Sequence, residues 1–219
     1  MGFINEYFFC EQVRPELMDR LWANGWRHFG SYFFRYEKLY TRNAKYNVMP
    51  LRINLQNFTY SKSQKRILKK NQDLQVIIRD AFIDRVKEDL FFAHRNRFKE
   101  NVPDSIYTFL SYDPANIPCC TKEICLYQDE KLLAASFLDV GKSSTSSIYT
   151  IFDPTEIKRS LGIYVILLAV DYSLKANCQY YYPGYAYKEP SHYDYKKKFA
   201  ALEYYHWDDK WLSLRSINE

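Results

Sequence analysis

Five cations on one face of a short predicted helix are the most distinctive chemical feature of the sequence. Ser61 and Gln64 fit a capping box at the start of this helix, and Asn71 fits its end. Like charges on one stripe repel each other, and a polyphosphate partner relieves that repulsion by releasing counterions. The pattern predicts phosphate binding; a solvated charged face is the alternative. The basic residues recur at i, i+3, i+4, i+7 and i+8: Lys62, Lys65, Arg66, Lys69 and Lys70.

A second candidate anion site is the start of a later helix, directly after a predicted strand. Backbone N–H groups at a helix start carry a partial positive charge and face an incoming anion. Ser160 and Gly162 lie at this start, and Arg159 can add a bidentate phosphate contact. A plain helix cap is the alternative, and Asp153, which precedes a proline, is most simply a turn residue.

A tyrosine-rich segment, residues 180–187, reads as a strand whose rings alternate between two faces. Gly184 within it indicates a bulge or a close approach by another group. Tyr185 and, further on, Tyr195 with Lys196 belong to the same aromatic region, where a ring could stack on a nucleobase.

Acids near these elements are candidates for proton transfer. Asp139 alternates with Phe137 at the end of a predicted strand and is expected to face inward, and Glu203 lies near the C-terminus. The sequence contains no G-x-S-x-G elbow and no Walker loop, so covalent catalysis is not expected. The five cysteines form no C-x-x-C pair, and no structural metal is expected.

Composition narrows the class of protein. The 219 residues are 18% aromatic, which excludes a disordered or collagen-like chain, and the net charge of +5 permits a nucleic-acid partner. The longest apolar run, residues 163–170, is far shorter than the ~20 residues that span a bilayer. No signal peptide is recognisable, so we expect a cytoplasmic protein without a membrane partner.

The elements that must position these residues alternate in type. The pattern predicts helices over residues 15–23, 61–71, 75–95 and 160–175, and strands over 26–36, 47–58, 124–127, 132–140, 147–152 and 180–187. This order indicates an α+β fold with a mixed, mostly antiparallel sheet flanked by helices. We expect an N-terminal part with the basic helix, residues 1–71, and a core, residues 72–219, closely packed or forming a single domain.

Several segments, read in order, resemble the aminoacyl-tRNA–protein transferases: the arginyltransferases and the bacterial enzymes that place leucine on N-terminal Asp or Glu. The resemblance runs from about Trp22 to Trp211 and is carried by residues 26–32, 50–53, 58–66, 69–71, 148–154, 159–162, 181–185 and 195–196. It implies a fold related to the GCN5-related N-acetyltransferases (GNAT), with aminoacyl-tRNA as co-substrate and no cofactor. Residues 42–49 lack the C-x-x-C that family members carry there, so the metal or iron–sulfur role of those cysteines is not inherited.

The resemblance implies transfer of an amino acid, Arg or Leu, to an amine of a protein or peptide by direct aminolysis of the ester. The basic face and the 159–162 helix start would hold the tRNA acceptor end. Asp139, or else Glu203, would orient or deprotonate the acceptor amine. The remaining substrate-binding candidates are Tyr149, Asp153, Gly184, Tyr185, Tyr195 and Lys196, with Tyr149 and Tyr185 lining the aminoacyl pocket.

Two other functions fit parts of the sequence. An acetyl-CoA-dependent acetyltransferase would read (Q/R)-x-x-G-x-(G/A) at the helix start, and Arg159 and Gly162 match its first half. Tyr164 replaces the small sixth residue, and a bulky side chain there would obstruct a pyrophosphate. The other alternative is an inactive module that binds tRNA or peptide without turnover.

Overall fold

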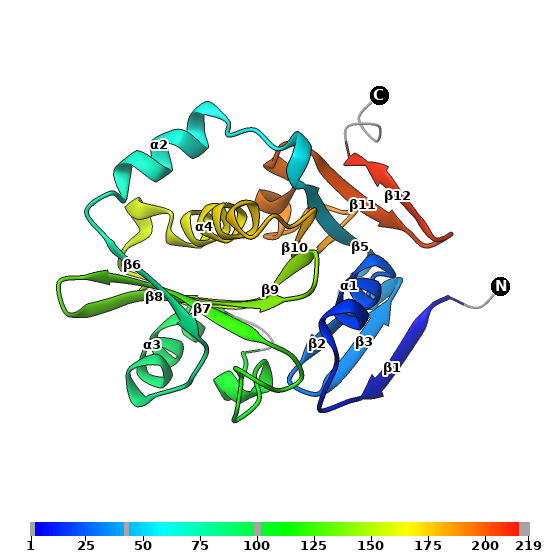
Figure 1. Cartoon of the computed structure of the whole chain (residues 1–219), viewed down its shortest axis with the longest axis horizontal. Helices are drawn as coiled ribbons and strands as arrows, with labels where there is room; N and C mark the ends of the chain where they lie inside the picture. The colour runs from blue at the N-terminus through cyan, green and yellow to red at the C-terminus, as the bar shows by residue number, and fades with distance from the viewer. Residues whose placement is uncertain (1–2, 42–43, 99–101, 215–219) are drawn as a thin grey trace.

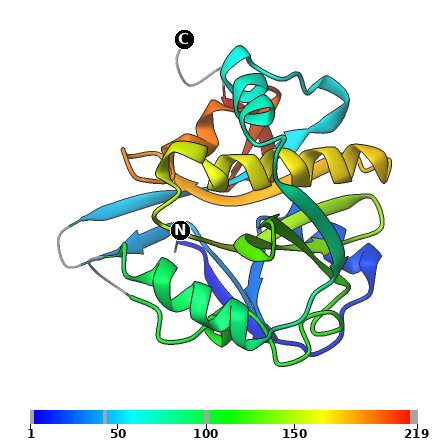
Figure 2. The same ribbon diagram turned by 90° about the vertical axis from the view of Figure 1, so that its left-hand side faces the viewer.

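The fold is built on one large sheet with helices on both faces. The computed structural model describes residues 3–41, 44–98 and 102–214. Figure 1 shows α4 (Leu161–Lys175) on one face of the sheet, with α2 (Lys62–Lys70) outside it, and α3 (Arg85–Arg95) on the opposite face. Figure 2 shows the same separation from the side. None of the described helices is both long and apolar enough to cross a membrane.

The large sheet has nine strands, and eight of them follow the order β12-β11-β5-β10-β9-β8-β7-β6, while β4 pairs with β5. Every pairing is antiparallel except β9 with β10, which α4 connects as a crossover. The strands span Lys38–Tyr40 (β4), Lys45–Asn54 (β5), Gln75–Asp80 (β6), Thr121–Gln128 (β7), Lys131–Val140 (β8), Ser144–Phe152 (β9), Tyr180–Tyr187 (β10), Leu202–His206 (β11) and Lys210–Ser213 (β12). The expected α+β class with a mixed, mostly antiparallel sheet is confirmed, in the order of strands and crossover helix expected of a GNAT-like fold.

A smaller, three-stranded sheet in the order β1-β3-β2 lies beside the large one. Its strands are Asn5–Phe9 (β1), Arg27–Phe29 (β2) and Tyr32–Tyr36 (β3), and α1 (Pro15–Ala23) precedes β2. The predicted strand over 26–36 is thus a hairpin that turns at Gly30, which has a φ of +51°. The boundary expected near residue 71 stays a prediction.

Strands β9 and β10 pair over three residues only and then separate. The parallel ladder joins Tyr180, Tyr181 and Tyr182 to residues 144–146 of β9. Pro183 follows, and proline has no N–H to donate to a further ladder bond. Gly184, at a φ of +96°, comes next, and the pairing of β10 with β5 shifts register between Tyr181 and Gly184. The sequence of β10 therefore ends the parallel pairing early.

A second irregularity bends β9 just beyond the same point. Leu138 of β8 pairs with Ser147, but Ser136 pairs with Thr150, so β9 contains an extra residue between them. Such a bulge turns the following side chains away from their regular direction. The bulge contains Tyr149, which was predicted to bind substrate.

The predicted helix over 75–95 is wrong in its first ten residues, 75–84. Residues Gln75–Asp80 form β6, which pairs with β7, and α3 begins only after Asp84, whose side chain accepts a hydrogen bond from the N–H of Lys87. The β-branched residues Val76, Ile77 and Ile78 fit a pleated surface better than a helix.

The strand predicted over 47–58 ends at Asn54, because Leu55–Asn57 form a 3-10 helix (η1) that the Asn54 side chain caps. Most other elements are where the pattern predicted them. The capping box of α2 is present in full, and the hairpin of β7 and β8 and the strand β10 are confirmed. Strand β9 begins at Ser144, three residues earlier than predicted. In α4, Val165 and Ala169 are buried against the sheet. A short 3-10 helix, η4 (Asp194–Lys198), follows β10 and packs on it.

Candidate functional site

The five cations of α2 lie together on its exposed face. All five are exposed, whereas Gln64 on the opposite face is buried beside half-buried Ile67 and Leu68. Within the described part of the chain, none of the five forms an ion pair with a carboxylate. We call this surface the α2 basic face: Lys62, Lys65, Arg66, Lys69 and Lys70.

The end of α2 contacts the start of α4 directly. Lys70 Nζ donates to the carbonyl oxygen of Lys158 at 2.5 Å, and the side-chain amide of Asn71 donates to the carbonyl oxygen of Arg159 at 3.0 Å. Tyr164 Oη reaches the carbonyl oxygen of Asn71 at 3.4 Å. The two segments predicted to hold tRNA are therefore neighbours in space, although about ninety residues separate them in sequence.

The side chains at the start of α4 already have partners within the protein, which was not expected. Arg159 makes a bidentate contact with Asp73, at 3.0 and 2.8 Å, so its guanidinium is already paired. A Cβ on Gly162 would lie 3.3 Å from the ring of Phe152, so close helix–strand packing accounts for this glycine. Ser160 adopts a left-handed conformation with a φ of +55°. Asp153 accepts from Lys131 at 2.7 Å and from Thr155, which is the arrangement of a turn residue.

The side chain of Tyr164 does not lie in front of the N-terminus of α4. Its side chain is 5% exposed and packs in the core, with its hydroxyl on Asn71. The expectation that Tyr164 would obstruct an incoming pyrophosphate is therefore wrong.

The second part of the site is the region where β9 and β10 cease to pair, after Tyr182. We call this region, residues 147–149 of β9 and 183–185 of β10 with the side chains around them, the strand cleft. On the β9 side, the ring of Tyr149 stacks on Phe109 with centroids 3.8 Å apart. The Tyr149 hydroxyl is buried and has no hydrogen-bond partner among the described residues. Burial raises the pKa of this phenol to about 12, so the hydroxyl stays protonated and can donate. An unsatisfied buried donor is costly, which makes it a good candidate to meet a ligand.

Two cations meet over Gly184 of β10. A Cβ built on Gly184 would lie 3.1 Å from Lys196 Nζ and 3.8 Å from Arg27 Nη2, so both side chains pass over the glycine. Arg27 donates to Ser146 Oγ and to the carbonyl oxygen of Ser147, both on β9. Lys196 Nζ donates to the carbonyl oxygen of Tyr185 at 3.2 Å. Within the described residues, neither cation forms an ion pair.

Burial changes the charge state of this pair. Loss of water, and secondarily the nearby Arg27, lower the pKa of Lys196 to about 7. Burial also lowers the pKa of Arg27, and the negative charge of Asp139 partly offsets this lowering. A half-buried lysine that is easily deprotonated is typical of functional sites.

Asp139 lies in a closed network behind Arg27. It is 1% exposed and accepts from Thr121 Oγ1 at 2.7 Å and from His28 Nε2 at 2.6 Å. His28 Nδ1 faces the carbonyl oxygen of Gly30 at 2.9 Å, so both ring nitrogens face oxygen atoms. Because both carboxylate oxygens are engaged, this geometry suits a residue that positions others. Its predicted role at the acceptor amine stays a prediction.

Cys119 completes a compact group with His28 and Asp139. Their ligand atoms all lie within 4.8 Å of one another, and such a set could hold a metal ion. The hydrogen bond between His28 and Asp139 already satisfies two of the three, and burial raises the pKa of the Cys119 thiol far above its usual range, which opposes thiolate formation. The expectation of no structural metal stays a prediction.

The remaining predicted residues are spread around the strand cleft. Tyr185 turns its hydroxyl to the carbonyl oxygen of Gly25 at 2.6 Å, toward the small sheet, and Tyr195 is 36% exposed. Glu203 pairs with Arg52 at 2.6 Å, and Arg52 also lies over the rings of Tyr180 and Trp211. The structure therefore brings Gly184 and Lys196 together and leaves Glu203 in an ion pair on β11.

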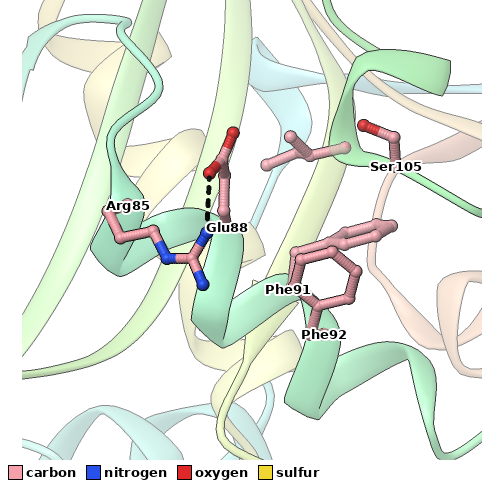
Figure 3. A pocket seen from close by; sticks show the side chains of 6 residues that line it. Arg85, Glu88, Phe91, Phe92 and Ser105 are labelled. Atoms are coloured by element: carbon pink, nitrogen blue, oxygen red, sulfur yellow. Dashed lines mark ion pairs between the residues drawn. The ribbon is translucent and has the colours of Figure 1, made fainter.

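Two small cavities contain none of the predicted residues. Figure 3 shows one of about 150 Å³ beside α3, where Arg85 pairs with Glu88 at 3.9 Å next to Phe91 and Phe92. The other, of about 480 Å³, is lined by Phe29, Tyr32 and residues of the 107–117 loop.

Sequence reasoning missed Arg27 and Phe109. Arg27 lies in a motif that carries the resemblance, residues 26–32, but no spacing rule connects it to Lys196, 169 positions later. Phe109 follows the short 3-10 helix η2 (Ile106–Thr108), in a segment read only as loop.

The depressed pKa of Lys196 predicts a specific pH dependence of stability. The unfolded chain keeps this proton up to about pH 10.5, whereas the folded chain releases it near pH 7, so this group raises the free energy of unfolding as pH rises between those values. We expect wild type to gain about 1–2 kcal/mol relative to Lys196→Met from pH 7 to pH 9, measured by urea denaturation. Lys198→Met, on the same element, is the control, and an equal pH response of wild type and Lys196→Met would contradict the assignment.

Comparison with known proteins gives the family. Residues 60–206 match the family described as "Arginine-tRNA-protein transferase, C terminus", a span from just before α2 to the end of β11. An aspartate/glutamate leucyltransferase from Saccharophagus degradans is 30% identical over 210 residues, covering 92% of this chain and 85% of the relative. One from Helicobacter hepaticus is 26% identical over 205 residues, covering 91% and 83%.

A solved structure supports the fold. The C-terminal domain of a putative lysylphosphatidylglycerol synthetase from Agrobacterium fabrum superposes with a TM-score of 0.50 at 15% identity. The match covers 85% of this chain and 56% of that one. The family match extends over two thirds of the chain and agrees with the motifs found in the sequence. The chain therefore belongs to the aminoacyl-tRNA–protein transferases, through the region shared with the C-terminal part of the arginine-tRNA-protein transferases.

Proposed function

We propose that this protein transfers leucine from leucyl-tRNA to the α-amine of a polypeptide that begins with Asp or Glu. The observation that carries the proposal is the contact between the end of α2 and the start of α4, because it sets the exposed cations of the α2 basic face beside the helix start that was predicted to hold the tRNA acceptor end. The relatives named aspartate/glutamate leucyltransferase support both the donor and the acceptor.

The α2 basic face is suited to the acceptor end of tRNA. Its cations are exposed and have no acidic partners within the described residues, so a phosphate backbone can replace their counterions. Arg159 is held by Asp73 and Glu156, and it contributes to this surface by fixing the α4 start against α2.

The strand cleft favours an apolar aminoacyl group over arginine. The stacked rings of Tyr149 and Phe109 lie at its β9 side, and the charged groups beside it are the cations Arg27 and Lys196. An arginyl side chain would need a free carboxylate, and both oxygens of the nearest one, on Asp139, are already engaged. A leucyl side chain needs only apolar contact, which the rings supply.

The reaction needs positioning more than chemical activation. The neutral acceptor amine attacks the ester carbonyl carbon, a C–N bond forms and the C–O bond to the terminal ribose breaks. The ribose oxygen leaves with the proton that the amine loses, so no covalent enzyme intermediate forms. An α-amino group has a pKa of about 7.7–8.0, so a useful fraction is neutral near pH 7.5. Holding ester and amine together can supply several kcal/mol of the barrier.

Tyr149 is the residue best placed to assist the ester. Its hydroxyl stays protonated and is unsatisfied, so it can donate to the ester oxygen as negative charge develops there. Asp139 acts through His28 and Arg27, as a positioning residue.

A transfer assay tests the proposed function. Purified protein is incubated with leucyl-tRNA, arginyl-tRNA or acetyl-CoA, together with peptides that begin with Asp, Glu, Lys or Ala. The masses of the peptide products are then measured by mass spectrometry. We expect one leucine added to the Asp and Glu peptides. Transfer from acetyl-CoA alone would contradict the proposal, and so would binding of leucyl-tRNA without turnover.

Charge reversal tests the α2 basic face. We expect Lys65→Glu/Arg66→Glu to weaken tRNA binding by at least tenfold at low salt and to flatten the dependence of binding on salt concentration, because fewer counterions are released. Filter binding at several salt concentrations measures both.

Lys142→Glu/Lys175→Glu changes the net charge equally at exposed positions away from α2 and is the matched control. Equal loss of affinity in both double variants would show a general charge effect and remove the assignment.

A further inference from the structure

We propose that Arg27 and Lys196 together bind the side-chain carboxylate of the acceptor's first residue, and so select Asp and Glu. This inference rests on the proposed function and adds to it the residues that read the acceptor. Neither the family match nor the relatives' names assign these residues a role.

The geometry is that of a prepared anion site. Two hydrogen bonds to β9, at Ser146 and Ser147, fix the guanidinium plane of Arg27, and a bond to Tyr185 fixes the ammonium of Lys196. Both groups pass over Gly184, where an added Cβ would lie in tight contact with Lys196 Nζ, at 3.1 Å, and where a φ of +96° favours glycine. The glycine therefore leaves the space in which the two cations meet.

Among the described residues, no carboxylate pairs with either cation, so an anionic ligand could balance their charge. Two cations side by side repel each other, and partial burial adds a desolvation cost. The pKa of Lys196, lowered to about 7, records that cost. The nearest carboxylate, on Asp139, is held by His28 and Thr121, and the other groups near Arg27 are the neutral phenols of Tyr181 and Tyr185. A bound anion would restore the charge on Lys196 and offset the repulsion.

The site favours a carboxylate on a short side chain over a tRNA phosphate. Arg27 and Lys196 are half-buried, so part of each side chain is exposed to solvent. A carboxylate at the tip of an Asp or Glu side chain is small enough to approach the exposed part of these two groups and to accept bonds from a guanidinium and an ammonium. A phosphodiester is flanked by two riboses and fits the open α2 basic face better.

The position relative to the ester agrees with this role. Arg27 and Lys196 meet over Gly184 of β10, and Arg27 also bonds to Ser146 and Ser147 of β9. Tyr149 follows on β9, just beyond the point where the strands separate. A first residue anchored by its carboxylate on the cations would hold its α-amine within the cleft, next to the aminoacyl ester. The same contact would then select the acceptor and align its amine.

The test compares acceptors that differ only in charge. Peptides beginning with Asp, Asn, Glu or Gln are assayed for kcat/KM with leucyl-tRNA and, separately, for equilibrium binding by fluorescence anisotropy. For wild type we expect Asp to exceed Asn by about 100-fold in kcat/KM, as a carboxylate paired with two cations would give. For Lys196→Met the Asp/Asn ratio falls at least tenfold, while transfer to the Asn peptide continues.

Matched variants and tRNA binding separate the alternatives. Lys198→Met, exposed on the same short helix, keeps the wild-type ratio, and Arg27→Lys, which keeps the charge, retains part of it. Equal slowing of all four acceptors by Lys196→Met, with an unchanged ratio, would overturn the proposal. A loss of tRNA affinity with an unchanged Asp/Asn ratio would also overturn it, by assigning the pair to a tRNA phosphate.

The binding arm distinguishes failure of the inference from failure of the proposed function. If wild type transfers no amino acid but binds the Asp peptide at least tenfold more tightly than the Asn peptide, and Lys196→Met removes this difference, the proposed function fails and the carboxylate site stands. If wild type transfers leucine equally to Asp and Asn peptides, the proposed transfer stands and the carboxylate site is excluded.

Discussion

The early separation of β9 from β10 is the constraint on which the rest of the structure depends. After three paired residues, Pro183 offers no N–H, and backbone groups of β9 lose their strand partner. Unpaired backbone groups inside a protein are costly, and Arg27 of the small sheet satisfies one of them by donating to the carbonyl oxygen of Ser147. The same guanidinium therefore joins the two sheets, closes the end of the ladder and brings a positive charge to the strand cleft.

Positive charge is used in two different ways in this molecule. On the α2 basic face the cations are exposed, so their attraction is long-ranged and strongly screened by salt. Arg27 and Lys196 are partly buried, so their interaction with an anion is short-ranged and depends on exact placement. The first arrangement suits a large polyanion such as tRNA, and the second suits the choice between a carboxylate and an amide.

Local signals in the sequence predicted much of the fold. The capping residues Ser61 and Gln64 and the breaker Asn71 define α2, and the apolar pattern of residues 160–175 defines α4. The helix predicted over 75–95 failed where two patterns meet, because strand β6 precedes α3 with only four residues between them. The site was less predictable. Gly184 and Lys196 were recognised as candidates, but their partner Arg27 comes from another sheet, and only tertiary pairing brings these residues together.

The most direct test of the strand cleft as the reaction site is a crystal structure of the protein with a leucyl-adenosine analogue whose ester is replaced by an amide. The leucyl group should lie against Tyr149 and Phe109, with its carbonyl oxygen near the Tyr149 hydroxyl and the analogue's linkage facing Lys196. Density for the leucyl group in the cavity beside Phe29 and Tyr32, or at the start of α4 without contact to Tyr149, would contradict this account.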